Sequence, residues 1–156
     1  MTRLTVSFER RLVGLVALDS SRRLVFPTLP EAPGLYQFSV EDQGGSSGVY
    51  VGETDTLRRR AQHNRTPGAR QPTNLRSNAE LAEALGRGVR VGVAVVTAAT
   101  LDLDDASPRA LKLDLKSNRL IVENAAIAAI GAACDESPGS APHPLNRPGV
   151  GEDAWG

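Results

Sequence analysis

The sequence contains one cysteine, few aromatic residues and no long uninterrupted apolar run. Cys134 is the single cysteine of the 156 residues, which excludes an internal disulfide, a cysteine metal cluster and a redox pair. Charged residues interrupt the N-terminus from Arg3 to Arg11, so we expect no export signal. The longest apolar run, residues 120 to 134, contains Glu123 and is shorter than the roughly 20 residues of a membrane span. These absences predict a cytoplasmic protein that does not enter a membrane.

An excess of one charge is also missing, because the 18 basic and 18 acidic residues cancel. A site for a polyanion therefore needs local segregation of charge. Residues 57 to 79 show such segregation, since they contain six arginines and His63 but no acid. A solvated helix face would give the same pattern. The alternative prediction is a nucleic-acid-binding surface formed by Arg58, Arg59, Arg65, Arg70 and Arg76.

The apolar periodicity divides the chain into short strands and helices. The predicted strands cover residues 3 to 8, 12 to 18, 35 to 40, 48 to 52 and 89 to 97. The predicted helices cover 56 to 65, 78 to 88 and 117 to 133, the last after an acidic linker over 101 to 108 and a helical segment from about 108. The tail from Asp135 is expected to be loop.

This order of elements predicts an α/β or α+β domain. We expect a small, mainly antiparallel central β-sheet of about three strands, flanked by helices and preceded by an N-terminal β extension. The length of the chain suits one compact domain with a core of its own.

The only two tyrosines, Tyr36 and Tyr50, fall in two short strands that a glycine-serine loop joins into a hairpin. Alternation places Tyr36 with Phe38 and Val40 on one face of the first strand. Consecutive arginines follow the hairpin within a few residues. Tyrosine suits a half-buried strand and arginine suits an exposed helix, so a purely structural interpretation also fits this stretch.

Glu123 lies in the most apolar predicted helix, on one stripe with Ile127, Ile130 and Cys134. A buried carboxylate there needs a cation, a hydrogen-bond network or a raised pKa, because burying an unpaired charge is costly. A single carboxylate with open coordination positions suits Mg²⁺, which keeps several of its waters. The alternative is a residue at the helix end that reaches solvent or pairs with Arg119 one turn earlier.

The stretch around the tyrosines resembles the GIY-YIG nuclease superfamily, and especially its excision-repair members. The two signature motifs are matched by Gly34-Leu35-Tyr36 and Tyr50-Val51-Gly52. The leucine, arginine, glutamate and asparagine that follow in the family are matched by Leu57, Arg60, Glu123 and Asn146. The resemblance covers residues 29 to 149, with 1 to 28 as an N-terminal extension and 150 to 156 as a C-terminal tail.

The chain departs from the family pattern beside the arginine. Many members carry a histidine or tyrosine four residues after it, whereas His63 lies three residues after Arg60. Either Asn64 takes that place or Arg59 is the functional arginine.

The resemblance implies a metal-dependent DNA endonuclease that hydrolyses phosphodiester bonds. The implied catalytic residues are Tyr36, Tyr50, Arg60, His63, Glu123 and Asn146, with Mg²⁺ or Mn²⁺ held by Glu123. Tyr36 would accept a proton from the attacking water, Tyr50 would position water or phosphate, and Arg60 would stabilise the charge on the phosphate. An unperturbed phenol has a pKa near ~10, so we expect a nearby cation to favour the tyrosinate.

Two other classes of function compete with a nuclease. One is a non-catalytic nucleic-acid-binding module of the same fold, against which the retained tyrosines, arginine and glutamate argue. The other is a plain structural or interaction domain, which leaves the arginine segment and Glu123 unexplained.

Overall fold

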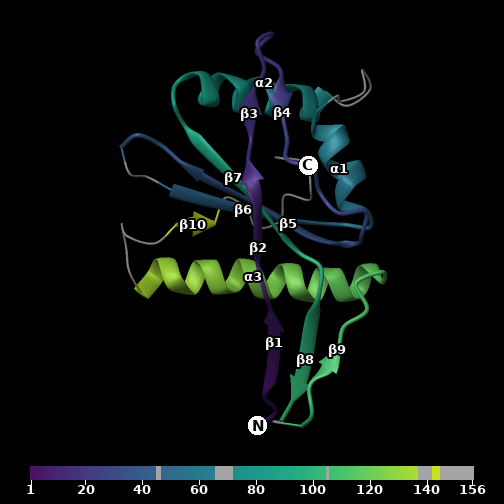
Figure 1. Ribbon diagram of the computed structural model, residues 1–156. Helices are drawn as coiled ribbons and strands as arrows, with labels where there is room; N and C mark the ends of the chain where they lie inside the picture. The colour runs from purple at the N-terminus through teal and green to yellow at the C-terminus, as the bar shows by residue number, and fades with distance from the viewer. Residues whose placement is uncertain (45–46, 66–71, 105, 137–141, 145–156) are drawn as a thin grey trace.

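The computed structural model describes residues 1–44, 47–65, 72–104, 106–136 and 142–144. For residues 63–65, 72–77 and 143–144 it describes the backbone alone. The elements lie around a central sheet, with helices on either side of it and a smaller sheet at one end (Figure 1).

The central sheet has five strands in the order β10-β6-β5-β7-β2. Their bounds are β2 (Arg11–Leu15), β5 (Gly34–Glu41), β6 (Ser47–Thr54), β7 (Arg90–Val96) and β10 (His143–Pro144). The predicted hairpin is its middle, β5 and β6, and β7 and β2 continue the antiparallel order. β10 pairs with β6 in parallel. The predicted α+β class with a mainly antiparallel sheet is confirmed. β2, from the predicted N-terminal extension, and β10 widen that sheet beyond the three or so strands that were expected.

Helices cover both faces of this sheet. They are α1 (Leu57–Arg65), α2 (Pro72–Gly86) and α3 (Lys116–Glu136). Because successive side chains of a strand point to opposite faces, Tyr36 and Tyr50 pack on one face with Leu57 of α1. Val51 packs on the opposite face against Val122 of α3. Helices were predicted at all three places, although α2 begins earlier than expected.

A second sheet, of order β1-β8-β9, extends beyond α3 at the N-terminal end of the molecule (Figure 1). Its strands are β1 (Leu4–Phe8), β8 (Ala99–Leu103) and β9 (Arg109–Ala110). The predicted acidic linker is therefore wrong at its start, where residues 101 to 103 belong to β8, and the helical segment expected from 108 is strand and loop. The reason is a distant partner, because β1 pairs with β8 along its whole length.

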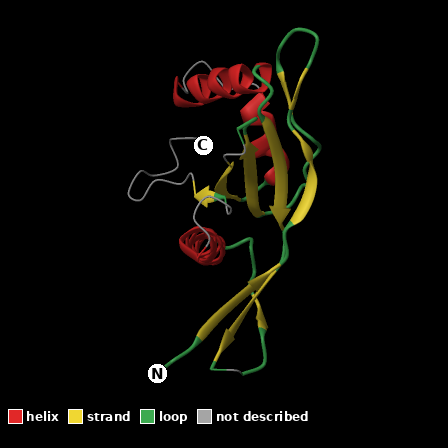
Figure 2. Ribbon diagram, turned by 90° about the vertical axis from the view of Figure 1, so that its left-hand side faces the viewer, coloured by secondary structure: helices red, strands yellow, loops and turns green. Residues whose placement is uncertain are grey.

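The N-terminal strands run along the whole molecule. β1 belongs to the second sheet, β2 to the central sheet, and β3 (Ala17–Leu18) forms a two-stranded ribbon with β4 (Leu24–Val25). Seen from the side, α3 is viewed end-on between the second sheet and the end that carries α1 and α2 (Figure 2). In the part of the chain that is described, no helix has both the length and the apolar character needed to cross a membrane.

The expected C-terminal loop is partly wrong. The last residues of α3 and strand β10 fall within the tail from Asp135, which was expected to be loop throughout. The long apolar stripe of α3 carries its helix to Glu136.

Candidate active site

Tyr36 and Tyr50 lie side by side on the face of the sheet that α1 covers. In the register of the hairpin, Phe38 is directly opposite Tyr50, and Tyr36 is opposite Gly52, so the two tyrosines are diagonal neighbours. Their ring centroids are 6.1 Å apart, and the side-chain hydroxyls share a hydrogen bond. Both residues are buried, at 3% and 6% exposure. The predicted tyrosine pair is therefore one compact unit.

The glycines of the two motifs are required by close packing. A methyl group at Gly52 would overlap Cζ and Oη of Tyr36, so the phenol can lie across β6 only because no side chain stands opposite it. A methyl group at Gly34 would overlap the carbonyl oxygen of Val96 on β7. Gly52 therefore determines where the Tyr36 hydroxyl lies.

Arg60 approaches the tyrosines from the first turn of α1. The helix is anchored by Leu57, which is fully buried and donates its backbone N–H to the carbonyl of Ala32 at 2.9 Å. One turn along, the guanidinium carbon of Arg60 lies 5.3 Å from the centroid of the Tyr36 ring, and its side chain hydrogen-bonds the Tyr36 hydroxyl. Of the two arginines considered, Arg60 is the one that contacts Tyr36.

The neighbouring arginines of α1 face acids instead. Arg58 pairs with Glu31 at 3.1 Å, and Arg59 binds both carboxylate oxygens of Asp55, one of them at 2.7 Å. The Arg59 hydrogen bond lowers the pKa of Asp55. These pairs are exposed, so each contributes about 0–1 kcal/mol to folding. The two acids lie outside the acid-free segment in sequence, but in the structure they offset part of its positive charge.

Several other predicted residues lie where no side chain is described. His63 and Arg65 belong to the backbone of α1, and Arg76 to that of α2. Arg70 and Asn146 lie outside the described residues. Their predicted roles stay predictions.

Glu123 joins the tyrosines from the opposite side of the sheet. It is half-buried on α3, and its charge raises the pKa of both Tyr36 and Tyr50. α3 packs against β6 on the other face of the sheet, and the outer edge of β6 is the edge that faces away from β5. Within the described chain, β10 pairs with only two residues of that edge, Gly48 and Val49, which leaves the edge beside Tyr50 uncovered by a strand.

The alternative partner expected for Glu123 is engaged elsewhere. Arg119 binds Glu53 of β6, with 2.6 Å between Nε and Oε2, and both side chains are almost fully buried. Sequence reasoning assigned no role to Glu53. The signal that could have revealed it is an acid near the end of a largely apolar strand, in alternation with Val49 and Val51 on the face turned toward α3.

The tyrosine hydroxyls are protonated at neutral pH. Burial raises the pKa of Tyr36, whereas Arg60 and the hydrogen bonds from Tyr50 and Arg60 act to lower it. Burial also raises the pKa of Tyr50, and the tyrosine-tyrosine hydrogen bond raises it further. Arg60 favours the tyrosinate, as expected of a nearby cation, but burial outweighs it, so the pKa of Tyr36 remains raised in the folded chain.

The donor set near the tyrosines fits a hard divalent cation rather than zinc. Among the described residues no group of three or more His, Cys, Asp or Glu side chains lies together. Glu123 is one half-buried carboxylate whose charge acts on both tyrosines, and Mg²⁺ or Mn²⁺ accepts one or two protein oxygens and keeps water in its other positions.

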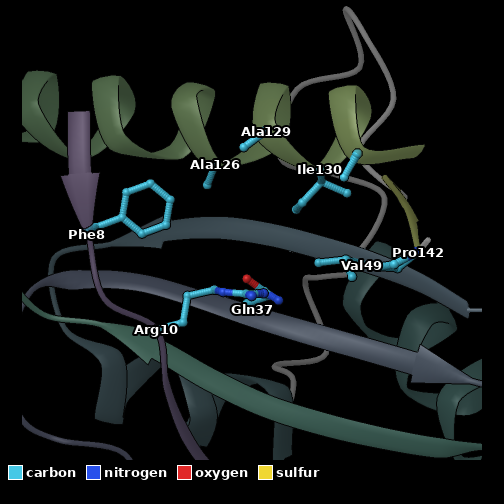
Figure 3. A pocket seen from close by; sticks show the side chains of 9 residues that line it. Phe8, Arg10, Gln37, Val49, Ala126, Ala129, Ile130 and Pro142 are labelled. Carbon is cyan, nitrogen blue, oxygen red and sulfur yellow. The ribbon is translucent and has the colours of Figure 1, made fainter. Parts of the chain in front are cut away.

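A cavity of about 410 Å³ lies on the opposite face of the sheet, between α3 and the strands (Figure 3). Gln37, the neighbour of Tyr36 in β5, forms part of its floor, and Arg10 extends over it. Most of the other lining side chains are apolar, among them Phe8 and Ile130. The predicted site residues are not among its lining residues, so this cavity is separate from the tyrosine site.

Comparisons with known proteins give one structural likeness to report. No protein-family model matches the chain, and no curated protein matches it. A solved structure of a mutant of bacteriophage T4 EndoII matches with a TM-score of 0.43 and 19% sequence identity, over 56% of this chain and 66% of that chain. This chain thus spans just under two thirds of that protein's length. At this level the likeness assigns neither a family nor an activity.

Proposed function

We propose that this chain is a metal-dependent DNA endonuclease of the GIY-YIG type. The observation that carries the proposal is the convergence of Tyr36, Tyr50, Arg60 and Glu123, which come from two strands and two helices far apart in the sequence. A cation, a carboxylate and two phenols around one point can together bind a phosphate, hold a metal and move a proton. A structural domain has no need to bring these four groups together.

Tyr36 is our candidate for the group that takes the proton of the attacking water. Arg60 hydrogen-bonds the Tyr36 hydroxyl and its guanidinium carbon lies 5.3 Å from the centroid of the Tyr36 ring, so a negative charge on the Tyr36 oxygen has a cation beside it. Tyr50 keeps its proton and orients the Tyr36 oxygen. Arg60, half-buried beside Tyr36, would bind the scissile phosphate, where a preorganised cation stabilises developing charge more than it would in water.

Glu123 would hold the divalent cation at the edge of β6. When bound, the cation would polarise the phosphate and offset the Glu123 charge, which is one of the charges that disfavour the tyrosinate. His63 and Asn146 complete the proposed catalytic set, and Arg65, Arg70 and Arg76 the proposed DNA-binding surface. DNA as the substrate follows from the family resemblance and the arginine-rich segment.

The test is incubation of the purified chain with supercoiled plasmid, linear duplex and single-stranded DNA, with Mg²⁺, with Mn²⁺ and with a chelator. We expect nicked or linear product only when metal is present. A Tyr36→Phe preparation purified in the same way controls for contaminating nucleases. A chain that shifts DNA in a gel but yields no product with any metal is the non-catalytic binding module, and one that does neither is a structural domain.

A further inference from the structure

Glu53 and Arg119 form a buried ion pair between β6 and α3, and the exposed Lys116 of α3 lies 3.9 Å from the other Glu53 oxygen. The side chains are 5% and 6% exposed, and Arg119 Nε donates to Glu53 Oε2 at 2.6 Å. Arg119 Nη1 also donates to the backbone carbonyls of Leu113 and Asp114, each at 2.9 Å. One guanidinium thus ties together a strand, the segment that precedes α3, and the first turns of α3 itself.

A contribution to the stability of α3 does not explain why this ion pair is buried here. A cation near the N-terminus of a helix opposes the helix dipole, and α3 has no acid in its first turn to offset it. Removing two charges from water is costly, and such a pair often contributes no more to stability than apolar side chains of similar volume. What a guanidinium offers that apolar packing does not is a planar fork of donors with fixed directions.

Each residue of the pair is also close in sequence to a residue of the proposed site, Glu53 on β6 and Arg119 on α3. Glu53 follows Gly52, the residue on which Tyr36 rests, and Arg119 lies one helical turn before Glu123. Four residues correspond to about 6 Å along a helix axis, so a shift or rotation of α3 at Arg119 is passed directly to Glu123.

We propose that the Glu53–Arg119 pair is a positioning device that fixes α3 against β6 and so holds the Glu123 carboxylate at the tyrosine pair, in the geometry that a divalent cation requires. The inference rests on the proposed function, because it assumes that Glu123 holds the metal. Neither residue touches the reacting atoms. Their effect acts through the placement of Glu123.

The decisive variant is Arg119→Lys, which keeps the charge but replaces the fork by one ammonium that cannot reproduce the bonds to Glu53 and both carbonyls. Binding of Mn²⁺ alone is measured by electron paramagnetic resonance, together with plasmid cleavage over a range of Mn²⁺ concentrations. We expect the Kd for Mn²⁺ to rise about tenfold or more, the usual effect of losing a group that orients a metal ligand. Cleavage should fall most at low Mn²⁺ and recover in part as Mn²⁺ is raised.

Two controls separate positioning from stability. Arg87→Lys makes the same chemical change in the exposed Arg87–Glu83 pair of 2.8 Å and should leave Mn²⁺ binding unchanged. Leu24→Ala removes a buried side chain from β4, away from α3, and should lower the melting temperature at least as much as Arg119→Lys without weakening Mn²⁺ binding. Glu53→Asp, which withdraws the carboxylate by one methylene, replaces Arg119→Lys if that variant does not fold.

The results distinguish this inference from the proposed function. Wild-type affinity for Mn²⁺ in a folded Arg119→Lys or Glu53→Asp variant would overturn the positioning role alone. Weakening of Mn²⁺ binding by Leu24→Ala to the same extent would also overturn it, because general destabilisation would then suffice. A wild-type chain that neither binds Mn²⁺ nor cleaves DNA would overturn the proposed function and this inference with it.

Discussion

The two faces of the central sheet each hold an arginine, and the surroundings of the two differ. Arg119 is sealed between α3 and β6, with a carboxylate and two carbonyls as its acceptors. Arg60 is only half-buried, lies over the ring of Tyr36, and shares its site with titratable hydroxyls and with Glu123, which is also half-buried. A sealed pair can fix geometry, whereas the cation and the carboxylate proposed to act on a polyanion, Arg60 and Glu123, both keep partial exposure to solvent. Burial of charge alone therefore does not mark the reacting site.

The largest expected effect comes from removing the Tyr36 hydroxyl. Tyr36→Phe keeps the ring over Gly52 but removes the proposed proton acceptor, so cleavage should fall about 10²-fold or more. Stability should change by only about 1 kcal/mol, the usual effect of one hydrogen bond. Tyr50→Phe is the matched variant and should lose less activity, since it removes the hydroxyl proposed to orient Tyr36 and not the proposed proton acceptor. Equal rates for wild type and Tyr36→Phe in a plasmid-nicking time course would remove the proposed role of Tyr36.

The next largest effect is expected at Gly52. A methyl group there forces the Tyr36 ring to move, which should lower the free energy of unfolding by about 1–3 kcal/mol and reduce cleavage together with it. Gly92→Ala on β7 is the control, because a methyl group there would lie 3.8 Å from Cδ1 of Leu12, which is an ordinary van der Waals contact. Chemical denaturation of both variants makes the comparison. Equal stability of the two would show that Gly52 does not determine the position of Tyr36.

Alkaline titration gives a smaller effect that is specific to the tyrosine face. Both tyrosine pKa values are raised above 10 in the folded chain, so the unfolded chain loses these protons first. The free energy of unfolding should therefore be unaffected below about pH 10 and fall above it, by up to about 1.4 kcal/mol per pH unit for each tyrosine. The near-ultraviolet absorbance of tyrosinate follows only Tyr36 and Tyr50. Full ionisation below pH 10 in the folded chain would contradict the burial argument.

The smallest expected effect concerns the acids that pair with the α1 arginines. Glu31→Gln and Asp55→Asn should each strengthen DNA binding, by less than about fivefold, because they release Arg58 and Arg59 from exposed pairs. Binding should weaken steeply with salt in all variants. Fluorescence anisotropy with a labelled duplex measures this, and Glu83→Gln, which releases Arg87 just after α2, is the control. Weaker binding by the Glu31 and Asp55 variants would exclude Arg58 and Arg59 from the DNA surface.

The local parts of the fold could be predicted from the sequence, and the long-range pairings could not. Alternation within a few residues is enough to place Tyr36 and Tyr50 on one face of a hairpin. The sequence of β8 predicts a linker, because the alternation of Leu101, Asp102 and Leu103 is too short to indicate a strand by itself. It forms a strand because it pairs with β1, which lies far earlier in the chain. Composition and turn residues do not identify such a partner.

The candidate site was predictable to a similar extent. Its residues could be named from motif resemblance, and the structure brings Tyr36, Tyr50 and Arg60 into contact, with the charge of Glu123 acting on both tyrosines. The sequence could not predict whether burial or the Arg60 charge has the larger effect on the tyrosine pKa values, because the burial depends on three-dimensional packing. The choice of Glu53 over Glu123 as the partner of Arg119 likewise depends on how α3 lies against β6.

Glu123→Gln tests the central claim most directly, because it preserves shape and removes the charge proposed to hold the metal. Plasmid cleavage, DNA binding in the presence of a chelator, and thermal melting should be measured on the same preparation. We predict a folded protein with an unchanged melting temperature, DNA affinity equal to or tighter than wild type, and cleavage reduced about 10²-fold or more. A stable Glu123→Gln variant that cuts DNA at the wild-type rate would contradict the metal assignment, and a destabilised variant would identify Glu123 as a structural residue instead.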